Sequence, residues 1–244
     1  MFEPKPSRAL SYIIGANIGD GCSLTKSGCV KLEVVDLDFA ETFNRSMAVL
    51  FSRVRPNVIL RRIFTSGRLP LYIVKYTSRQ LVKLLRLPLR DLLKLAFAYP
   101  REFLRGFFDA EGHVDVSAVR RFQLSVGAEN SNKFLLRRVR ELLRIAFGMR
   151  SFIDSKRKAG STKVIRGRTF VMRRASFSLV ICRWSDECKF AEGVGFSILR
   201  KEQKLVDALQ IVASEPPSNR SSAWKVLYTK ERGEWVRRPS VSLG

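Results

Sequence analysis

SYIIGANIGDG at residues 11–21 and EFLRGFFDAEG at residues 102–112 are two versions of one pattern. Small residues and acids recur in them at a constant separation of 91 residues: Gly15 and Gly106, Gly19 and Ala110, Asp20 and Glu111. The similarity continues downstream, where Leu32-Glu-Val34 corresponds to Leu124-Ser-Val126. Self-similarity over this length predicts a chain built from a duplicated unit.

Each unit is expected to fold in the order α-β-β-α-β-β-α. A helix comes first, with Ser7 as the N-cap of one and Pro100 in the first turn of the other, and each is followed by a glycine. Alternating apolar and polar residues then predict strands. The expected elements are helices over 8–20, 38–53, 78–87, 89–98, 100–111, 131–147 and 185–210, strands around 30–34 and 122–126, and second hairpins that turn at Ser66-Gly67 and span about 151–183.

The predicted fold class is therefore α+β with pseudo-twofold symmetry, in which antiparallel, saddle-shaped sheets have helices behind and an open front. We expect a first repeat over 1–99, a second over 100–213 and a basic C-terminal extension over 214–244. The start of that extension is rich in Pro, Ser and Asn, which is typical of a linker. Trp224 and Trp235 beyond it could pack back on the body or lie along a DNA backbone, and the sequence leaves both open.

The charge indicates a polyanionic partner. The chain has 45 Lys and Arg against 22 Asp and Glu, a formal charge of +23 over 244 residues. Hydrophobic residues make up 45%, enough for a packed core, which excludes wholesale disorder. No apolar run approaches the roughly 18 residues of a membrane span, and the N-terminus lacks a secretory pattern, so an intracellular chain is expected. Nucleic acid is favoured over an anionic membrane surface as the partner, because neutralising phosphates releases counterions.

The four cysteines do not indicate a zinc site. Cys22 and Cys29, and likewise Cys182 and Cys188, lack the CxxC spacing of structural zinc ligands, and the chain has one histidine. Buried free thiols are the favoured interpretation. A Cys22–Cys29 bridge across a short hairpin is the alternative for an oxidising or hyperthermophilic cell.

The open front of the sheets is predicted to face DNA. Arg and Lys favour guanine, and Gln favours adenine, when such side chains read the major groove. Each residue taken alone could be an ordinary solvated side chain, but the set lies on strands and loops of a strongly basic chain. The predicted contacts are Lys26, Lys31, Glu33, Arg61, Arg62, Arg68, Lys75, Arg120, Gln123, Ser125, Lys156, Lys158, Arg166, Arg168, Arg173 and Arg174.

The acids Asp20 and Glu111 are the candidate catalytic centre. Small residues at Gly15, Gly19, Gly106 and Ala110 allow the two helices to approach more closely than the usual interaxial distance of about 8–10 Å. The acids would then meet at two helix C-termini, which are themselves negative, so they must share a proton or bind a cation. Oxygen ligands suit Mg²⁺, which supports phosphodiester hydrolysis. The alternative is two helix ends whose acids pair with nearby arginines.

IIGANIGDG (13–21) and LRGFFDAEG (104–112) resemble the two motifs of single-chain LAGLIDADG homing endonucleases, and the resemblance extends over about residues 7–210. It looks closest to the archaeal intron-encoded members. The family implies a monomer that cuts each strand of a long, pseudo-palindromic double-stranded DNA site once, across the minor groove. It also implies Mg²⁺, with Mn²⁺ or Ca²⁺ able to occupy the site, held by Asp20 and Glu111 with the backbone carbonyls of Gly19 and Ala110. Lys75 matches the place of a family lysine, with Arg183 a poorer match in the other repeat.

The sequence departs from the family at the strand before the second helix of each repeat. The family often has Gln or Lys there, whereas this chain has Asp36 in one repeat and Ala128-Glu129 in the other. Asp36 and Glu129 could order water or a metal, although surface acids are slightly favoured. His113 could bond a phosphate or be a turn residue. Alternatives on the same scaffold are an intron RNA-splicing maturase and a DNA-binding protein that does not cut.

Overall fold

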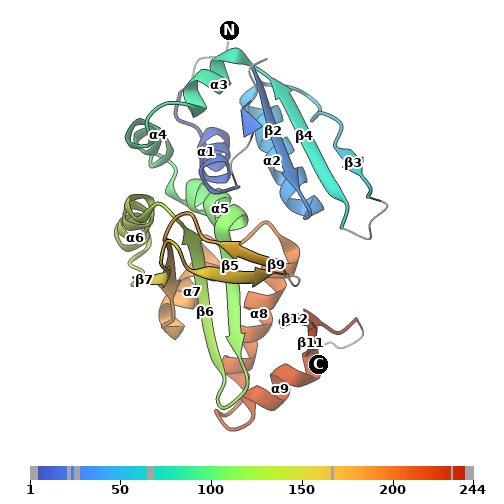
Figure 1. Ribbon diagram of the computed structural model, residues 1–244, viewed down its shortest axis with the longest axis vertical. Coiled ribbons are helices and arrows are strands. Elements are labelled where there is room, and N and C mark those ends of the chain that lie inside the picture. The colour runs from blue at the N-terminus through green and yellow to red at the C-terminus, as the bar shows by residue number, and fades with distance from the viewer. Residues whose placement is uncertain are drawn as a thin grey trace.

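The structure is a computed structural model, and it describes residues 5–20, 23–24, 28–64, 69–165, 168–231 and 233–239. Figure 1 shows two halves stacked along the long axis of the molecule, with α1 (Arg8–Asp20) and α5 (Pro100–Glu111) where the halves meet. No helix in the described residues has both the length and the apolar character needed to cross a membrane.

Both halves follow the same order of elements. After α1, the first half contains β1 (Ser23–Leu24), β2 (Cys29–Val34), α2 (Leu37–Leu50), β3 (Leu60–Arg62), β4 (Leu71–Thr77), α3 (Arg79–Leu85) and α4 (Leu89–Ala96). After α5, the second half contains β5 (Gly112–Ser117), β6 (Gln123–Asn130), α6 (Lys133–Phe147), β7 (Phe152–Arg157), β8 (Thr162–Ile165), β9 (Arg168–Val171), β10 (Ser176–Ile181), α7 (Trp184–Gly193) and α8 (Leu199–Ser214).

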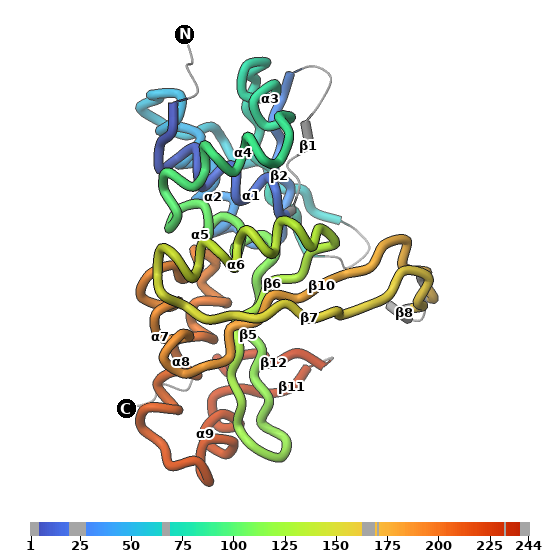
Figure 2. Tube along the Cα trace, turned by 90° about the vertical axis from the view of Figure 1, so that its left-hand side faces the viewer, coloured from blue at the N-terminus to red at the C-terminus, as the bar shows by residue number. Residues whose placement is uncertain are grey.

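The two main sheets are antiparallel and have equivalent topologies. Their strand orders are β1-β2-β4-β3 and β5-β6-β10-β7, so each first-half strand has a counterpart in the second half. The second half differs by an inserted hairpin, β8–β9, which projects away from the body in Figure 2. The predicted duplicated α+β fold is confirmed, and the insertion makes the two halves unequal.

Local capping chemistry fixes the ends of some helices, α1 and α6 among them. Ser7 Oγ accepts a hydrogen bond of 3.2 Å from the Leu10 N–H at the start of α1, and Asn132 caps α6 through Leu135 N–H at 3.1 Å. Gly148 ends α6 in the left-handed region at φ 62°. Gly112, expected to end α5 in the same way, is instead extended at φ −82° and ψ 154° and begins β5 directly. The turn expected at Ser66-Gly67 lies outside the described residues.

The core is continuous through both halves. The helix faces of α1 and α5 supply fully buried side chains to it, and the rest comes from the covered faces of the two sheets and the helices behind them. The fully buried members from the two central helices include Leu10, Ile13, Ile14, Phe103, Leu104, Phe107 and Phe108.

A second connection joins the halves at the periphery. Arg200 on α8 forms a two-pronged ion pair with Asp36, the N-cap residue of α2, at 2.7 and 2.8 Å. The neighbouring Leu199 N–H donates to Asp38 Oδ2. The Asp36 carboxylate therefore binds the opposite half of the molecule.

The segment after α8 is structured. The chain turns at 215–219 into α9 (Arg220–Leu227) and a hairpin of β11 (Tyr228–Glu231) and β12 (Glu234–Arg237). Trp224 is fully buried and stacks on Tyr228 with ring centroids 3.9 Å apart, and Trp235 Nε1 donates to Val116 O at 2.9 Å. Of the two placements that the sequence left open for these tryptophans, the structure adopts packing against the body.

Candidate metal centre and nucleic-acid interface

The contact between α1 and α5 is made by backbone against backbone. A Cβ added at Gly15 would lie 2.2 Å from Phe103 O, and one added at Gly106 would lie 2.3 Å from Tyr12 O. Real Cβ atoms do not tolerate such distances, so the contact requires glycine at both positions. Small residues bring these two helices together as the repeat suggested.

The same close approach continues to the C-terminal ends of the two helices. A Cβ added at Gly19 would lie 2.4 Å from Ala110 Cβ and 3.0 Å from Glu111 Cγ. The last turn of α1 therefore rests directly on the last turn of α5. Asp20, the next residue after Gly19, is the final residue of α1, and its side chain lies outside the described part of the structure.

Asn130 fixes the orientation of Glu111. Its Nδ2 donates to Glu111 Oε1 at 2.7 Å, while its Oδ1 accepts from the Asn132 N–H at 2.8 Å. Sequence reasoning missed Asn130 because it ended the strand at Ala128-Glu129, whereas β6 continues to Asn130. The available signal was an amide side chain two residues before the helix N-cap, at the place where the family often has a polar side chain.

A hollow of about 460 Å³ opens beside these residues, lined by Gly19, Glu111, Glu129 and Asn130 among others. Its lining offers the carboxylate, amide and hydroxyl oxygens that suit a hard cation such as Mg²⁺, and it also includes the cationic side chain of Arg157. Within the described residues, no three His, Cys, Asp or Glu side chains converge on one point. A cation here would therefore also need Asp20, backbone carbonyls or water. Lys75 does not line the described part of this hollow.

Asp109 holds the motif helices in register. This carboxylate is buried, and it accepts hydrogen bonds from Tyr12 Oη of α1 at 2.8 Å and from the Ser197 N–H at 2.8 Å, with a further contact to Ser197 Oγ. Burial raises the pKa of Asp109, and burial also raises the pKa of Tyr12 well above its ordinary value. The network connects α1, α5 and the α7–α8 loop, and sequence reasoning did not identify it.

Lys201 of α8 binds the end of α5. Its buried Nζ donates to Asp109 O at 2.6 Å and Phe108 O at 3.3 Å. These are carbonyls of the last helical turn, where the helix dipole is negative. A buried ammonium group therefore stabilises the turn that carries Glu111.

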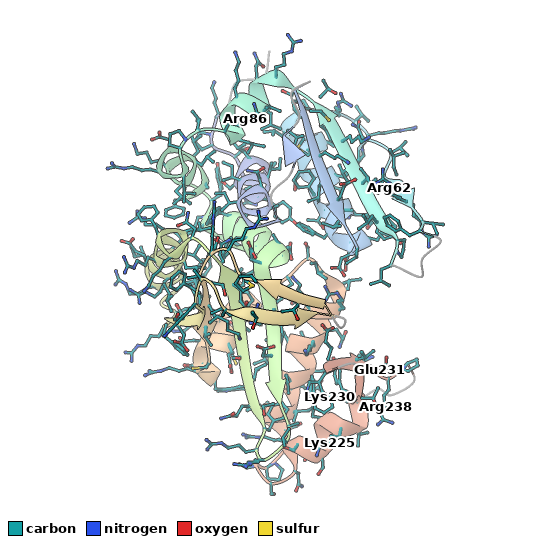
Figure 3. The ribbon with its side chains drawn as sticks, in the orientation of Figure 1. Arg62, Arg86, Lys225, Lys230, Glu231 and Arg238 are labelled. Atoms are coloured by element: carbon teal, nitrogen blue, oxygen red, sulfur yellow. The ribbon has the colours of Figure 1, made fainter. Side chains whose placement is uncertain are left out.

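The open face of the first sheet carries Lys31, Glu33, Arg62 and Lys75. Lys31 lies opposite Lys75, and Glu33 contacts Lys31 at 2.5 Å and Arg62 at 4.0 Å. Figure 3 shows Arg62 at the outer edge of this sheet. The prediction that Arg61 shares this face is wrong. It pairs with Tyr72, on the side that faces the helices, because successive strand residues point to opposite faces.

The second sheet has a more mixed open face than expected. Gln123 lies opposite Ser117, Ser125 lies opposite Asp115, and Glu129 pairs with Lys156 at 3.3 Å. The exposed cations among the predicted contacts of this half lie instead on the projecting segment and at the β5–β6 turn. The predicted contacts placed there are Lys156, Lys158, Arg173, Arg174 and, at the turn, Arg120. Lys26, Arg68, Arg166 and the Arg168 side chain lie outside the described residues.

His113 is a strand residue rather than a turn residue. It pairs with Gly127 across β5 and β6, and its Nε2 lies 3.4 Å from Asp115 Oδ2. Burial lowers the pKa of His113, with Asp115 acting in the opposite direction. The imidazole is therefore held in its neutral form more strongly than an exposed histidine would be.

The cysteines fit the favoured interpretation only in part. Cys182 and Cys188 form no disulfide, but Cys182 is exposed. Burial raises the pKa of the half-buried Cys188 thiol. Cys22 lies outside the described residues.

Comparisons with known proteins agree with this architecture. A family model described as a LAGLIDADG-like domain matches residues 98–195. The chain is 32% identical over 209 residues to the uncharacterized protein MJ0398 of Methanocaldococcus jannaschii, and the match covers 84% of this chain and 73% of that protein.

Among solved structures, the chain is similar to I-DmoI in complex with DNA and Ca, with 19% identity and a TM-score of 0.51, covering 90% of this chain and 97% of that one. It is also similar to full-length DUF199/WhiA from Thermatoga maritima, with 16% identity and a TM-score of 0.48, covering 90% and 66%. The likeness to I-DmoI concerns the fold. The family model, the duplicated motifs and the relative in M. jannaschii show that the chain belongs to the LAGLIDADG family.

Proposed function

We propose that this protein is a site-specific DNA endonuclease that hydrolyses one phosphodiester in each strand of a long duplex site. The observation that carries the proposal is the convergence of the two motif-helix ends, where Gly19 rests on Ala110 and Glu111 beside a hollow that Glu111 and Glu129 help to line. I-DmoI, which has the same fold, has been solved in complex with DNA and Ca.

In this proposal Asp20, Glu111 and the carbonyls of Gly19 and Ala110 hold a divalent cation, with Mg²⁺ the expected ion. Such an ion, when bound, lowers the pKa of water and stabilises charge on the phosphate. Asn130 keeps Glu111 oriented through their 2.7 Å hydrogen bond. Lys75 offsets negative charge that develops at the phosphate.

Binding is assigned to the open faces of both sheets and to the projecting hairpin. We propose that residues 1–99 and 100–213 each engage one half of the DNA site as parts of a single monomer, with 214–244 as a C-terminal extension. The cations of the first sheet and those of 156–174 would contact phosphates and base edges. Duplex affinity is therefore expected to fall steeply as salt is raised.

The test is cleavage of plasmid and genomic-fragment libraries in Mg²⁺, with Asp20→Asn/Glu111→Gln as the variant. Loss of cutting with retained duplex binding supports the proposal. Asp91→Asn/Glu192→Gln removes two acids outside the proposed site and serves as the charge-matched control. A folded double variant that still cuts would refute the site. Binding without cutting by the native protein would favour a regulator or a maturase on this scaffold.

A further inference from the structure

A strongly basic surface lies on the outer side of α6, which crosses the near face of the molecule in Figure 2. This helix carries five cations against one acid, whereas α2, its counterpart in the first half, carries one against two. The α2 helix shows that the fold does not require a basic helix at this position. The difference is therefore specific to the second half.

Three of the α6 arginines form one stripe. Arg137, Arg140 and Arg144 are exposed and are spaced three and four residues apart, which places them on the same side of the helix. Like charges at this spacing destabilise a helix. Arg138 pairs with Glu141, but no ion pair within the described residues includes any of the three stripe arginines. The stripe therefore lacks neutralising partners in the described structure.

The stripe borders a hollow with an aromatic side chain at its rim. Arg137, Arg140, Arg144 and Arg150 line a hollow of about 760 Å³ together with Phe134, which is 51% exposed. The ion-paired Arg138 and Glu141 also line it. Guanidinium groups bind phosphates in a planar fork, and an exposed phenyl ring stacks on unpaired bases. Arginine and aromatic groups around one hollow fit a single strand better than a duplex, whose bases are already stacked.

A duplex bound to the open faces of the sheets cannot also contact this surface of α6. The apolar side of α6, including Leu136 and Leu143, packs on the covered face of the second sheet, against β7 and β10. The stripe therefore points away from the sheet, whose open face lies on the other side. A nucleic acid bound at the stripe would be a second ligand.

We propose that the outer surface of α6, formed by Arg137, Arg140, Arg144, Arg150 and Phe134, is a binding site for single-stranded nucleic acid. The chemistry it recognises is a phosphodiester backbone with at least one unstacked base. RNA and single-stranded DNA share that chemistry, and the experiment below distinguishes them. The proposal does not depend on cleavage by the motif helices.

The test uses the full chain and fluorescence anisotropy with labelled oligouridylate and oligothymidylate of about 15 nucleotides, and with a mixed-sequence duplex. The variant is Arg137→Gln/Arg140→Gln/Arg144→Gln. Its control is Lys83→Gln/Arg90→Gln/Lys225→Gln, which removes the same charge from exposed positions scattered over three other helices. Both sets leave helix propensity nearly unchanged, so both variants should fold.

We expect the α6 variant to raise the Kd for the preferred single strand by about tenfold or more at 0.1 M salt, and to lower its salt slope by about 2. Duplex affinity should stay within about twofold of the native value, and the scattered control should change the single-strand Kd far less. Phe134→Ala, which keeps the charge, should raise the single-strand Kd by about fivefold or more. Stronger binding of the uridylate identifies RNA, and stronger binding of the thymidylate identifies DNA.

Equal losses in the α6 variant and the scattered control would show that only net charge matters and would overturn the proposal. An unchanged single-strand Kd in the α6 variant would overturn it as well. So would loss of binding to vesicles of phosphatidylcholine and phosphatidylglycerol without loss of oligonucleotide binding. Plasmid cleavage measured on the same variants reports on the endonuclease proposal separately, because the α6 residues lie outside the motif-helix site.

Discussion

Lys201 is a single side chain that stabilises the end of α5, one of the two motif helices. Its ammonium group bonds carbonyls in the last turn of α5, close to Glu111. We expect Lys201→Met to cost about 1.5–3 kcal/mol of stability, because a charged hydrogen-bonding group is lost from a buried site. If the endonuclease proposal holds, one strand should be cut more slowly than the other, so nicked plasmid should accumulate in single-turnover cleavage.

Lys204→Met is the matched control for that experiment. Lys204 lies three residues further along α8 and is half-buried, whereas the hydrogen bonds to the α5 carbonyls come from Lys201. The control should lose less stability and show no nicked intermediate. Equal accumulation of nicked plasmid in both variants would contradict a positioning role for Lys201.

Glu187 should make stability depend on pH. Burial and the neighbouring Asp186 raise the pKa of Glu187 to about 7 from 4.5, and its Oε1 has no hydrogen-bond partner in the described structure. The folded protein binds this proton more tightly than the unfolded chain does. Its stabilising contribution is thus fully present below about pH 4.5 and is lost as pH rises through about 7.

Glu187→Gln removes this titration. We expect the variant to melt at a higher temperature than the native protein at pH 8, and the gain to shrink or disappear at pH 5. Glu192→Gln, an exposed change on the same helix, should give similar differences at both values. A Glu187→Gln effect that is independent of pH in calorimetry would contradict the assignment.

At the scale of elements, the α1–α5 contact should tolerate almost no added volume at its glycines. A Cβ at Gly106 would lie 2.3 Å from Tyr12 O and 3.0 Å from Ala16 N, both backbone atoms that cannot move alone. Gly106→Ala should cost at least about 1–3 kcal/mol, the usual penalty of overpacking. Urea denaturation measures the loss.

Gly193→Ala is the comparison for this prediction. At that position the new Cβ would meet the Phe147 ring at 2.8 Å, and a side-chain ring can shift aside. The loss should therefore be smaller than for Gly106→Ala. Equal losses would show that the helix contact is softer than its geometry indicates.

Elements governed by local chemistry were predictable from the sequence. The α1 and α5 helices begin and end where Ser7, Pro100 and the repeat indicated, because caps and periodicity act within a few residues. By contrast, α9 and the β11–β12 hairpin were read as following a linker. The same Pro-Pro sequence suits a linker and a turn into a packed helix. Only the burial of Trp224 in the tertiary structure distinguishes the two.

The candidate site was predictable only in outline. The repeat predicted the helix contact at Gly15 and Gly106, because two backbones can come this close only where the residues are small. Asn130 was not identified because its role depends on the strand continuing one residue beyond the expected end at Glu129. The ion pair of Asp36 with Arg200 was not predicted, because the two residues are 164 positions apart and no local sequence pattern indicates such a contact.

At the scale of the whole molecule, the C-terminal extension should be part of the stable fold. Trp224 is fully buried, and Arg237 Nε binds Asp207 Oδ2 at 2.9 Å. Deleting 215–244 would uncover Phe122 and the edge of β5 next to Trp235. We expect a loss of more than about 3 kcal/mol and self-association through the exposed strand edge.

Differential scanning fluorimetry and size-exclusion chromatography at several concentrations measure these effects. Trp224→Ala should reproduce most of the loss of stability without exposing the strand edge. Lys225→Ala, an exposed change beside it, should melt like the native protein. A truncated chain that melts at the native temperature as a monomer would show that the extension is dispensable.

The peripheral ion pair between Asp36 and Arg200 also limits how the molecule can accommodate a ligand. Rocking of one half against the other about the central helices would have to break this two-pronged contact. The halves contact each other both at the central helices and at this peripheral ion pair, so the open faces of the two sheets keep a set orientation relative to each other. If the proposed duplex is the ligand, the curvature needed to match both surfaces would come from the double helix, so sequences that bend easily would be favoured even where no side chain touches a base.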